Sequence, residues 1–249
     1  MKETICVLIP TLNEADNITD CLRCFLNQKL KPNEIIVVDN GSKDKTRLVV
    51  TSLISKFKKS GIDLKLFFHP YGNQINARAY GINKTNCDII ASIDAETNVP
   101  KDWIYNIQKH FEEESLVGIG GKAKYRNREF LFNLIYSSLP RIRTMINKYY
   151  ITAGNCAYRR KAFIQVRGFE GLEKIRKKEK LVFAKDDFFI SKKLERIGKI
   201  KYYPDIKVTI LYRPKNKIGQ NVEKTTPMRI INRILLEMKE DRKISKYFK

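Results

Sequence analysis

The sequence has no apolar run long enough to cross a membrane. Its longest runs are those of single buried strands, far below the roughly 20 residues that a bilayer-spanning helix requires. The start of the chain, Met1-Lys-Glu-Thr4, leads directly into such a run. It contains neither a hydrophobic signal region nor a small-residue cleavage site. We therefore expect a cytoplasmic protein, either free or peripheral on the cytoplasmic face of a membrane.

Cysteine and histidine are both scarce. The five cysteines are scattered and odd in number, which favours a reducing compartment over a disulfide scaffold. Cys21 and Cys24 form a C-x-x-C pair, but there is no second pair, and the only histidines are His69 and His110. The pair fits better as core-sized residues of an amphipathic helix. A zinc site or a thioredoxin-type redox site is therefore disfavoured.

Acidic residues are fewer than basic ones: the chain has 27 Asp and Glu and 49 Lys and Arg, for a formal net charge of +22. Such an excess suits nucleic acid, an anionic membrane surface or a phosphate-bearing substrate, or reflects only a lysine-rich proteome. The chain is 43% hydrophobic and 31% charged, which is typical of a globular protein. Charge alone does not choose among these partners.

What the sequence does contain is a regular alternation of apolar runs and amphipathic segments. Short apolar runs at 5–9, 34–39, 64–68 and 88–94 predict strands. Segments with helical spacing lie between them, at 18–26, 48–57 and 73–82. This order is typical of right-handed βαβ units and a parallel sheet.

The pattern changes after Gly121. A helix beginning near Trp103 and a strand at 116–121 come before this point. A small-residue turn into a strand at 153–159 and a helix beginning at Asp186 come after it. Residues 130–150 form a long mixed segment, and the basic run at 173–180 predicts a solvated loop.

Polar side chains follow the predicted strands where each one ends. Pro10 to Glu14, Asp39, and Asp94 with Glu96 all occupy such positions. The carboxyl ends of parallel strands share one edge of a sheet, where ligands bind. Asp94 and Glu96 could hold Mg²⁺ or Mn²⁺ together with the phosphates of a substrate. The alternative is that Asp94 caps a turn and Glu96 is only solvated.

Two segments near the end of the chain allow two interpretations each. Asp186 and Asp187 open a helix, where the helix dipole alone would favour acidic residues. Residues after Thr226 predict a helix with an apolar stripe beside basic residues. Such a helix lies on a membrane surface or packs against its own domain. The stripe consists of Ile230, Ile231, Ile234, Leu235 and Met238.

Six segments together resemble the motifs of one family, the family 2 glycosyltransferases. Pro10-Thr11-Leu-Asn13-Glu14 resembles its P-x-x-N-E opening, and the stretch from Asp39 to Thr46 its D-x-S-x-D-x-T segment. Asn76 to Gly81 is similar to A-R-N-x-G, and Asp94-Ala95-Glu96 stands at the D-x-D metal motif. The stretch 152–160 with Gly168-Phe169 resembles the acceptor-side segments, and Asp186-Asp187 stands at the E-D position. The resemblance extends from Ile5 to about Tyr203.

The resemblance implies an α/β fold of the GT-A type. We expect a single Rossmann-like domain with a mostly parallel central sheet flanked by helices, followed by a C-terminal amphipathic helix. Residues 1–98 would form the nucleotide-sugar-binding half of a domain that ends at 212, and 99–212 the acceptor half. Residues 213–249 would form a basic helical extension.

The resemblance also implies roles for individual residues. Asp94 and Glu96 would hold the metal, Mn²⁺ or Mg²⁺, against the diphosphate. Gly154, Asn155 and Trp103 would face the donor or acceptor sugar. Asp187 would act as general base, with Asp186 beside it. The nucleotide-sugar would contact Pro10, Thr11, Asn13, Glu14, Asp39, Asn40, Ser42, Arg78, Asp94 and Ala95.

Four departures from the family pattern stand out. Glu96 replaces the usual second Asp, which lengthens one metal ligand by a methylene. Asp186 replaces the usual Glu, and Ala79 stands where Asn is common. The Q-x-x-R-W motif of processive synthases is missing, which argues against a polymerising enzyme of the cellulose-synthase kind.

The expected function is an inverting hexosyl transfer from a nucleoside-diphosphate sugar, with UDP favoured, to a hydroxyl group. The acceptor would be a glycan or glycolipid, such as a lipid-linked or cell-surface glycan precursor. The alternative within the class is a polyprenyl-phosphate glycosyltransferase that uses a GDP- or UDP-sugar. A nucleic-acid-binding protein is disfavoured because no binding motif accompanies the charge. A nucleotidyltransferase and a non-catalytic relative are the remaining alternatives.

Overall fold

The computed structural model describes residues 2–126, 151, 154–211 and 227–248, with side chains in the last stretch from Leu235 onward. The mixed segment at 130–150 therefore lies outside the described residues, as do most side chains of the apolar stripe after Thr226. The strands are β1 (Ile5–Thr11), β2 (Glu34–Asp39), β3 (Asp63–Phe68), β4 (Ile89–Ile93), β5 (Thr97–Asn98), β6 (Leu116–Arg126), β7 (Asn155–Arg159) and β8 (Lys199–Leu211). The helices are α1 (Ile18–Leu26), α2 (Thr46–Lys59), α3 (Gln74–Ile82), α4 (Trp103–His110), α6 (Arg160–Gln165), α7 (Leu172–Glu179), α8 (Asp186–Leu194) and α9 (Pro227–Ser245).

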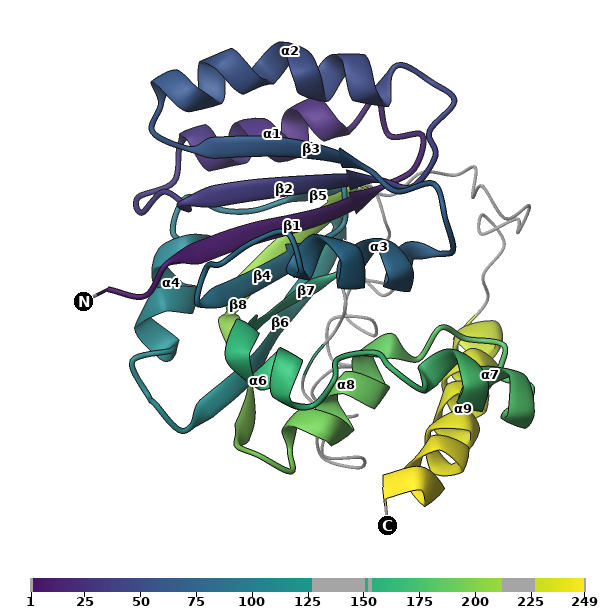
Figure 1. Ribbon diagram of the computed structural model, residues 1–249. Helices are drawn as coiled ribbons and strands as arrows, with labels where there is room; N and C mark the ends of the chain where they lie inside the picture. Colours follow the sequence, from purple (N-terminus) through teal and green to yellow (C-terminus); the bar gives the residue numbers. More distant parts are fainter. Residues whose placement is uncertain (1, 127–150, 152–153, 212–226, 249) are drawn as a thin grey trace.

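The strands form one mixed sheet of eight strands in the order β3-β2-β1-β4-β7-β6-β8-β5 (Figure 1). β1 to β4 are mutually parallel, as the alternation of strands and helices predicts. β7 runs antiparallel to both β4 and β6, and β8 returns parallel to β6. The sheet therefore changes from parallel to mixed between β4 and β7, immediately beside Asp94.

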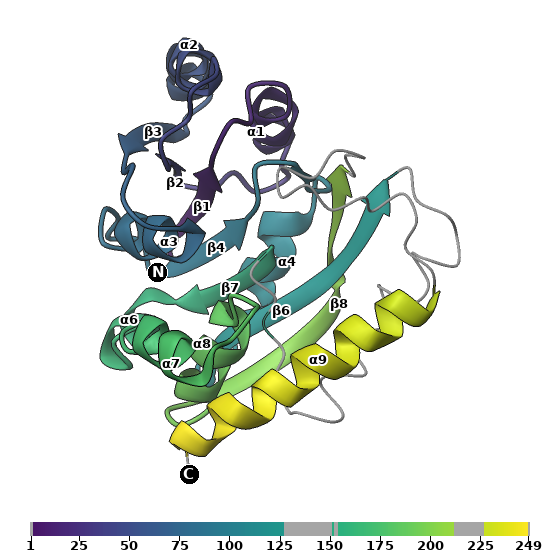
Figure 2. The same cartoon turned by 90° about the vertical axis from the view of Figure 1, so that its right-hand side faces the viewer.

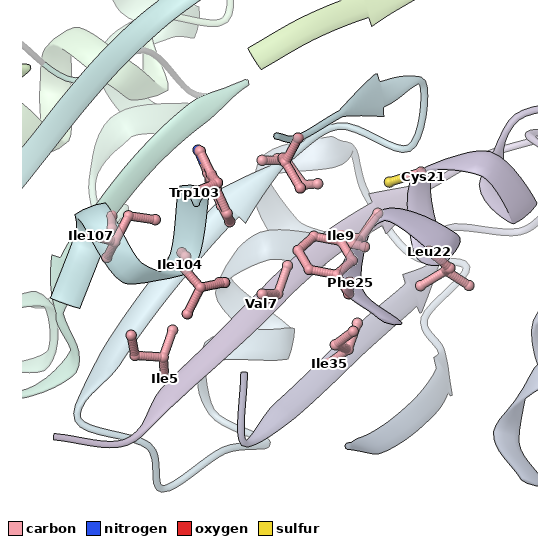
Figure 3. Close-up of a cluster of buried hydrophobic side chains, with 14 of the residues drawn as sticks. Ile5, Val7, Ile9, Cys21, Leu22, Phe25, Ile35, Trp103, Ile104 and Ile107 are labelled. Carbon is pink, nitrogen blue, oxygen red and sulfur yellow. The ribbon is translucent and has the colours of Figure 1, made fainter. Parts of the chain in front are cut away.

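Helices cover both faces of the sheet, because alternate residues of each buried strand point to opposite sides. Val7 and Ile9 of β1 pack with α1, α2 and α4 in one apolar cluster, part of which Figure 3 shows. Cys6 and Leu8 of the same strand pack with α3, α6 and α8 in another. This double cover explains why these strands read as continuous apolar runs.

Helix α3 lies very close to the sheet. A Cβ added at Gly81 would lie 2.3 Å from Leu8 Cδ1 and 2.9 Å from Val38 Cγ2. Only glycine fits between helix and strand at this separation. The glycine of the A-R-N-x-G segment therefore has a packing role, and it sets how far Arg78 on the same helix stands from the strand ends.

One sequence interpretation was wrong, and one strand was not predicted. The basic run at 173–180 is largely helix α7 and not a loop, because Leu172 and Ile175 pack into a third apolar cluster and Arg176 pairs with Glu173. Its remaining side chains are largely exposed, as expected of a charge run. Strand β8 was not predicted, since its apolar residues alternate with lysines and are interrupted by Pro204-Asp205. The pairing of β6 with β8 shifts register at this interruption.

The predicted C-terminal helix is present as α9, and Figure 2 shows it beside α7 and α8. Its Ile244 is fully buried in the third cluster with Phe188 and Phe189 of α8. Within the described part of the chain, no helix combines the length and apolar character needed to span a bilayer.

Candidate active site

The loops after β1 and β2 are joined by side-chain hydrogen bonds at the carboxyl edge of the sheet. Thr11 and Asp39 end their strands opposite one another, and Asn40 N donates to Thr11 O at 2.8 Å. Asn13, whose φ is +53°, donates its N–H to Ser42 Oγ at 2.8 Å. Its side-chain oxygen accepts from Lys43 N at 2.8 Å. The two predicted donor-binding loops thus form one structural unit.

Asp44 and Thr46 hold the other end of this unit. Thr46 Oγ1 accepts from Glu14 N at 2.8 Å, and Asp44 Oδ2 accepts from Ala15 N at 3.2 Å. Asp44 also accepts from the N–H and hydroxyl of Thr46. The second half of the D-x-S-x-D-x-T segment therefore fastens the β1 loop in place. Glu14 in turn accepts a hydrogen bond of 2.7 Å from Asn17.

Asp39 is fully buried between these loops. Its carboxylate accepts from Ser42 N at 3.2 and 3.3 Å, and Arg47 Nε lies 3.5 Å from its Oδ2. Beside it, Thr11 Oγ1 and Asn40 Oδ1 are buried and have no hydrogen-bond partner among the described residues. Buried polar atoms are normally paired, so these two oxygens mark a place where a ligand could supply donors.

Arg78 joins the two sides of the site. Its Nη2 lies 2.6 Å from Asp94 Oδ1, and its Nη1 lies 3.1 Å from Asp186 Oδ2. The guanidinium is almost completely buried, and burial alone would lower the pKa of Arg78. The charges of Asp94 and Asp186 outweigh burial and raise the pKa of Arg78 above its ordinary value. The arginine is therefore a permanent cation between two acidic segments 92 residues apart.

Gln74 is a site residue that the sequence did not indicate. Its Nε2 donates to Asp94 Oδ1 at 2.8 Å. Gln74 and Arg78 are four residues apart on α3 and so share one face of the helix. That spacing is the only signal that could have identified Gln74. Asn73 caps α3 by accepting from Ile75 N and Asn76 N, and the cap fixes this face relative to the strand ends.

Asp94 does begin a turn, with Thr97 N donating to its carbonyl at 3.0 Å, but its side chain is not used as the cap. One carboxylate oxygen is held by Arg78 and Gln74. The other, Oδ2, faces Gly154, where an added Cβ would lie only 2.9 Å away. Gly154 thus keeps clear the space on the second face of the carboxylate.

The residues present fit a Mg²⁺ or Mn²⁺ ion that is shared with a diphosphate. No group of three or more His, Cys, Asp or Glu side chains suited to a metal occurs among the described residues. Asp94 and Glu96 supply two carboxylates at the end of β4. One or two carboxylates plus substrate phosphates is the usual protein share of a Mg²⁺ site.

Trp103 and Asn155 lie in the core and not on an open surface. Both are fully buried, and Trp103 Nε1 donates to Asn155 Oδ1 at 3.1 Å. Asn155 Nδ2 donates to the carbonyls of Lys122 and Ile206, at 3.1 and 2.9 Å. Asn155 therefore ties β7 to β6, β8 and α4. The contact of these side chains with a sugar that the sequence led us to expect stays a prediction, and their burial does not support it.

The acidic pair divides into a buried and a more accessible member. Asp186 is 5% exposed and bound to Arg78. Asp187 is half-buried, and its Oδ1 accepts from Phe188 N at 2.7 Å. Both lie in the first turn of α8, as predicted. The side chains of Pro10 and Ala95 are buried, so these two can offer a ligand little beyond backbone.

A cavity of about 800 Å³ opens beside α3, on a side different from that of Arg78. Ile75, Asn76 and Ala79 line it from α3, and Gly168 and Phe169 line it from beyond α6. Of the candidate-site carboxylates, neither Asp94 nor Asp186 nor Asp187 lines this cavity. The Gly168-Phe169 segment, matched to an acceptor-side motif, therefore faces a different space.

Solved structures with similar folds are glycosyltransferases of the GT-A type. TarS from S. aureus in complex with UDP-GlcNAc superposes with a TM-score of 0.62 at 17% identity, covering 90% of this chain and 61% of that one. A mannosyltransferase from Pyrobaculum calidifontis, in complex with GDP-Man and Mn²⁺, gives 0.61 at 18% identity, covering 88% and 59%. The expected GT-A fold is thereby confirmed.

Relatives by sequence include a poly-beta-1,6-N-acetyl-D-glucosamine synthase of Staphylococcus aureus. It is 30% identical over 142 residues, covering 55% of this chain and 34% of the relative. A dolichyl N-acetyl-alpha-D-glucosaminyl phosphate 3-beta-D-2,3-diacetamido-2,3-dideoxy-beta-D-glucuronosyltransferase of Methanococcus voltae is 33% identical over 124 residues, covering 47% and 38%. The chain thus spans about a third of the length of such relatives. The sequence model of Glycosyl transferase family 2 matches residues 6–167, so this chain belongs to glycosyl transferase family 2.

Proposed function

We propose that this chain transfers a hexosyl group from a nucleoside-diphosphate sugar to an acceptor hydroxyl with inversion at the anomeric carbon. The observation that carries the proposal is the Arg78 bridge. It holds Asp94, at the end of the nucleotide-side strand β4, and Asp186, in the acidic pair of α8, on one buried guanidinium. A donor bound over Asp94 would therefore lie next to Asp187.

The donor side would use the joined β1 and β2 loops. Asp39 would accept hydrogen bonds from the base or ribose in place of, or beside, Arg47. The unpaired oxygens of Thr11 and Asn40 would take the remaining donors of the nucleoside. Asn13, Glu14 and Ser42 would act mainly by holding these loops in shape.

The diphosphate would lie over Asp94 and Glu96. A Mn²⁺ or Mg²⁺ ion held by these two carboxylates would neutralise the charge that develops on the departing β-phosphate. Arg78 adds a fixed positive charge close to the same point, and Gln74 orients the Asp94 carboxylate. Gly154 leaves room above Asp94 Oδ2.

The acceptor hydroxyl would attack the anomeric carbon from the face opposite the diphosphate. A new carbon–oxygen bond forms as the bond to the β-phosphate oxygen breaks, and the hydroxyl proton passes to Asp187. A hydroxyl is a poor nucleophile at neutral pH and requires such a base. Asp186 is buried against Arg78, so we assign the proton to Asp187, the less buried member of the pair.

UDP is the favoured nucleotide, because the solved complexes of a similar fold contain UDP and UDP-GlcNAc. A complex with GDP-Man keeps a GDP donor as the alternative. A polyprenyl phosphate would already be ionised and would need no base. The acidic pair on α8 therefore favours a hydroxyl acceptor on a glycan or glycolipid.

Asp187→Asn tests the assignment of the base. It should reduce transfer by at least about a hundredfold, the lower end of typical general-base contributions, and leave the affinity for UDP in the presence of Mn²⁺ nearly unchanged. Release of UDP from UDP-GlcNAc, with candidate glycan acceptors added, measures transfer, and isothermal titration measures affinity. Glu112→Gln, an exposed acid on the α4–β6 connection, is the matched control. Transfer at the wild-type rate in Asp187→Asn would remove Asp187 from the mechanism.

Removal of the metal tests the roles of Asp94 and Glu96 in the same assay. Chelation by EDTA should stop the release of UDP, and added Mn²⁺ should restore it. Undiminished turnover in EDTA would show that these carboxylates do not act through a metal. The absence of both UDP and GDP binding in the wild type would favour a non-catalytic relative.

A second proposal concerns where the acceptor is met. Leu235, Lys239 and Arg242 are exposed at helical spacing along one side of α9, and the exposed Lys246 begins the 3₁₀ turn directly after it. An apolar residue followed by three cations is suited to an anionic membrane surface. The proposed acceptor would then be a glycolipid on that surface, and flotation with lipid vesicles is the test.

A further inference from the structure

The segment that leads into the acidic pair is held by α9. Residues 181–185 connect α7 to α8, and Lys185 adopts a left-handed conformation, with φ of +61°, directly before Asp186. A residue with a side chain is held in this conformation only where surrounding contacts fix it. The contacts in question come from two adjacent carboxylates of α9, Glu240 and Asp241.

Asp241 forms a buried ion pair with Lys185. Lys185 Nζ lies 2.7 Å from Asp241 Oδ1 and donates to Glu237 O at 2.6 Å. The two side chains are only 5% and 3% exposed. A buried lysine and carboxylate are tolerated only when each is paired with good geometry. The position of the Lys185 ammonium, and with it the backbone just before Asp186, therefore depends on Asp241.

Glu240 holds the same segment by its backbone. One carboxylate oxygen accepts from Val182 N at 2.6 Å, and the other accepts from Phe183 N at 3.3 Å. The Glu240 side chain is buried, although its residue type is usually exposed. Two consecutive acidic residues of α9 thus bind both ends of the stretch from Val182 to Lys185.

The same end of α9 packs on α8 itself. Ile244 is buried with Phe188 and Phe189, and the Phe248 ring contacts Phe189 edge-on at a centroid distance of 5.4 Å. An apolar contact of this kind would be enough to attach the helix. The buried carboxylates also make the contact specific, because each binds particular atoms of the connecting segment.

We propose that Glu240 and Asp241 are positioning residues that set the location of Asp186 and Asp187 relative to Arg78. This inference rests on the proposed function, since it gives the acidic pair its catalytic meaning. Neither carboxylate would touch donor or acceptor. They act through Lys185, Val182 and Phe183, and α9 is accordingly part of the catalytic unit.

Hydrogen–deuterium exchange of the full chain, combined with turnover, tests the proposal. In Asp241→Asn and in Glu240→Gln, the amides of residues 181–190 should exchange at least about tenfold faster, the effect of losing roughly 1.4 kcal/mol of local protection. Amides of the donor loops at 34–46 should be unaffected. Glu114→Gln, an exposed acid-to-amide change on the α4–β6 connection, is the matched control.

Turnover distinguishes positioning from general stability. Release of UDP from UDP-GlcNAc in the presence of an acceptor should fall by about ten- to a hundredfold, the effect of a misplacement near 1 Å. The Kd for UDP with Mn²⁺ should change by less than about threefold, because the donor loops lie elsewhere. If Asp241→Asn does not fold, Glu240→Gln alone provides the comparison, since it retains the ion pair.

Three outcomes would overturn the proposal. One is unchanged exchange at 181–190, and another is unchanged turnover despite faster exchange. The third is a loss of UDP affinity as large as the loss of turnover. If the wild type neither binds UDP nor releases it from UDP-GlcNAc, the proposed function fails. The exchange result then still decides whether α9 holds the segment.

Discussion

At the scale of single residues, Arg78 shows how a buried charge can organise a site. A guanidinium that is almost fully buried is costly unless its charge is matched. Asp94 and Asp186 supply that match from two different parts of the chain. Arg78 therefore constrains both carboxylates at once. Replacement of either acid would leave the cation partly unpaired, which makes their geometry mutually dependent.

Gly154→Ala is expected to disturb Asp94 without disturbing the fold. The added Cβ would lie 2.9 Å from Asp94 Oδ2, and this carboxylate cannot easily retreat because Arg78 and Gln74 hold its other oxygen. We expect UDP affinity in the presence of Mn²⁺ to fall about tenfold, the equivalent of about 1.4 kcal/mol. Titration with and without Mn²⁺ measures this effect.

Gly61→Ala is the matched control for this substitution. Gly61 has no atom within 4 Å of an added Cβ, and its φ is +77°, so alanine there costs backbone strain alone. It should lower stability by about 1 kcal/mol and leave UDP affinity unchanged. Equal affinity in Gly154→Ala and the wild type would show that Asp94 does not contact the metal or the diphosphate.

The sequence identified the residues that carry charge at the site but not the residues that hold them. Asp39, Arg78, Asp94 and the acidic pair could be named because they end strands or match ordered motifs. Gln74 was not named, because its four-residue spacing from Arg78 is common on helices and does not by itself indicate a site. Asn155 was named for a sugar contact, which stays a prediction, and its hydrogen bonds to the carbonyls of β6 and β8 could not be foreseen because those strands are remote in sequence.

At the scale of elements, β1 and β4 are fastened together at their beginnings as well as paired along their length. Asp88 Oδ2 accepts from Thr4 N at 2.9 Å and from Thr4 Oγ1 at 2.8 Å. Thr4 Oγ1 in turn accepts from Asp88 N at 3.0 Å. These bonds fix the alignment of the two strands whose far ends carry Thr11 and Asp94.

The hydrogen bonds from Thr4 lower the pKa of Asp88 below its ordinary value. A carboxyl whose pKa is lowered by folding contributes stability above its unfolded pKa of about 4, and this contribution is lost as pH falls through the folded value. Asp88→Asn should therefore lower the free energy of unfolding at pH 7 by about 0.5–1 kcal/mol, a modest figure because the group is only partly buried. Urea unfolding at pH 7, 5 and 3.5 measures the difference.

The free energies of unfolding of Asp88→Asn and the wild type should become more similar as the pH approaches 3.5. Asp20→Asn, on an exposed face of α1, should show no such trend, because its only described ion pair is a surface contact of 4.0 Å with Arg23. If the two free energies of unfolding differ by the same amount from pH 7 to 3.5, the hydrogen bonds from Thr4 do not depend on the negative charge of Asp88.

Elements whose apolar pattern is set locally could be predicted closely. β2 was placed at 34–39, and α3 was expected with Asn73 at its start. α7 and β8 could not, because their partners are remote in sequence. α7 is stabilised by packing of Leu172 against α8 and α9 residues, and β8 by pairing with β6. The many lysines in both segments made their apolar pattern hard to recognise.

At the scale of the whole molecule, the predicted division at residue 212 remains a prediction. The boundary itself falls outside the described residues. α9 nevertheless contributes Glu240, Asp241 and Ile244 to the interior of the same body as α8. Among the described side chains of α9, Lys239 and Arg242 are exposed, so this part of the helix presents apolar and acidic residues inward and cations to solvent. This arrangement allows α9 to meet an external surface without leaving its own domain.

The net charge of +22 would give attraction to anionic surfaces in general, so a local test is needed. We expect the full chain to float with phosphatidylserine-containing vesicles at low salt and to stay behind with neutral ones. Reversing Lys239, Arg242 and Lys246 to Glu removes three cations that each contribute about 1 kcal/mol near such a surface, so binding should weaken more than about tenfold. The same reversal of Lys56, Lys58 and Lys59, exposed on α2, changes net charge equally. If both triple variants lose binding to the same extent, attraction comes from overall charge, and α9 is not the contact.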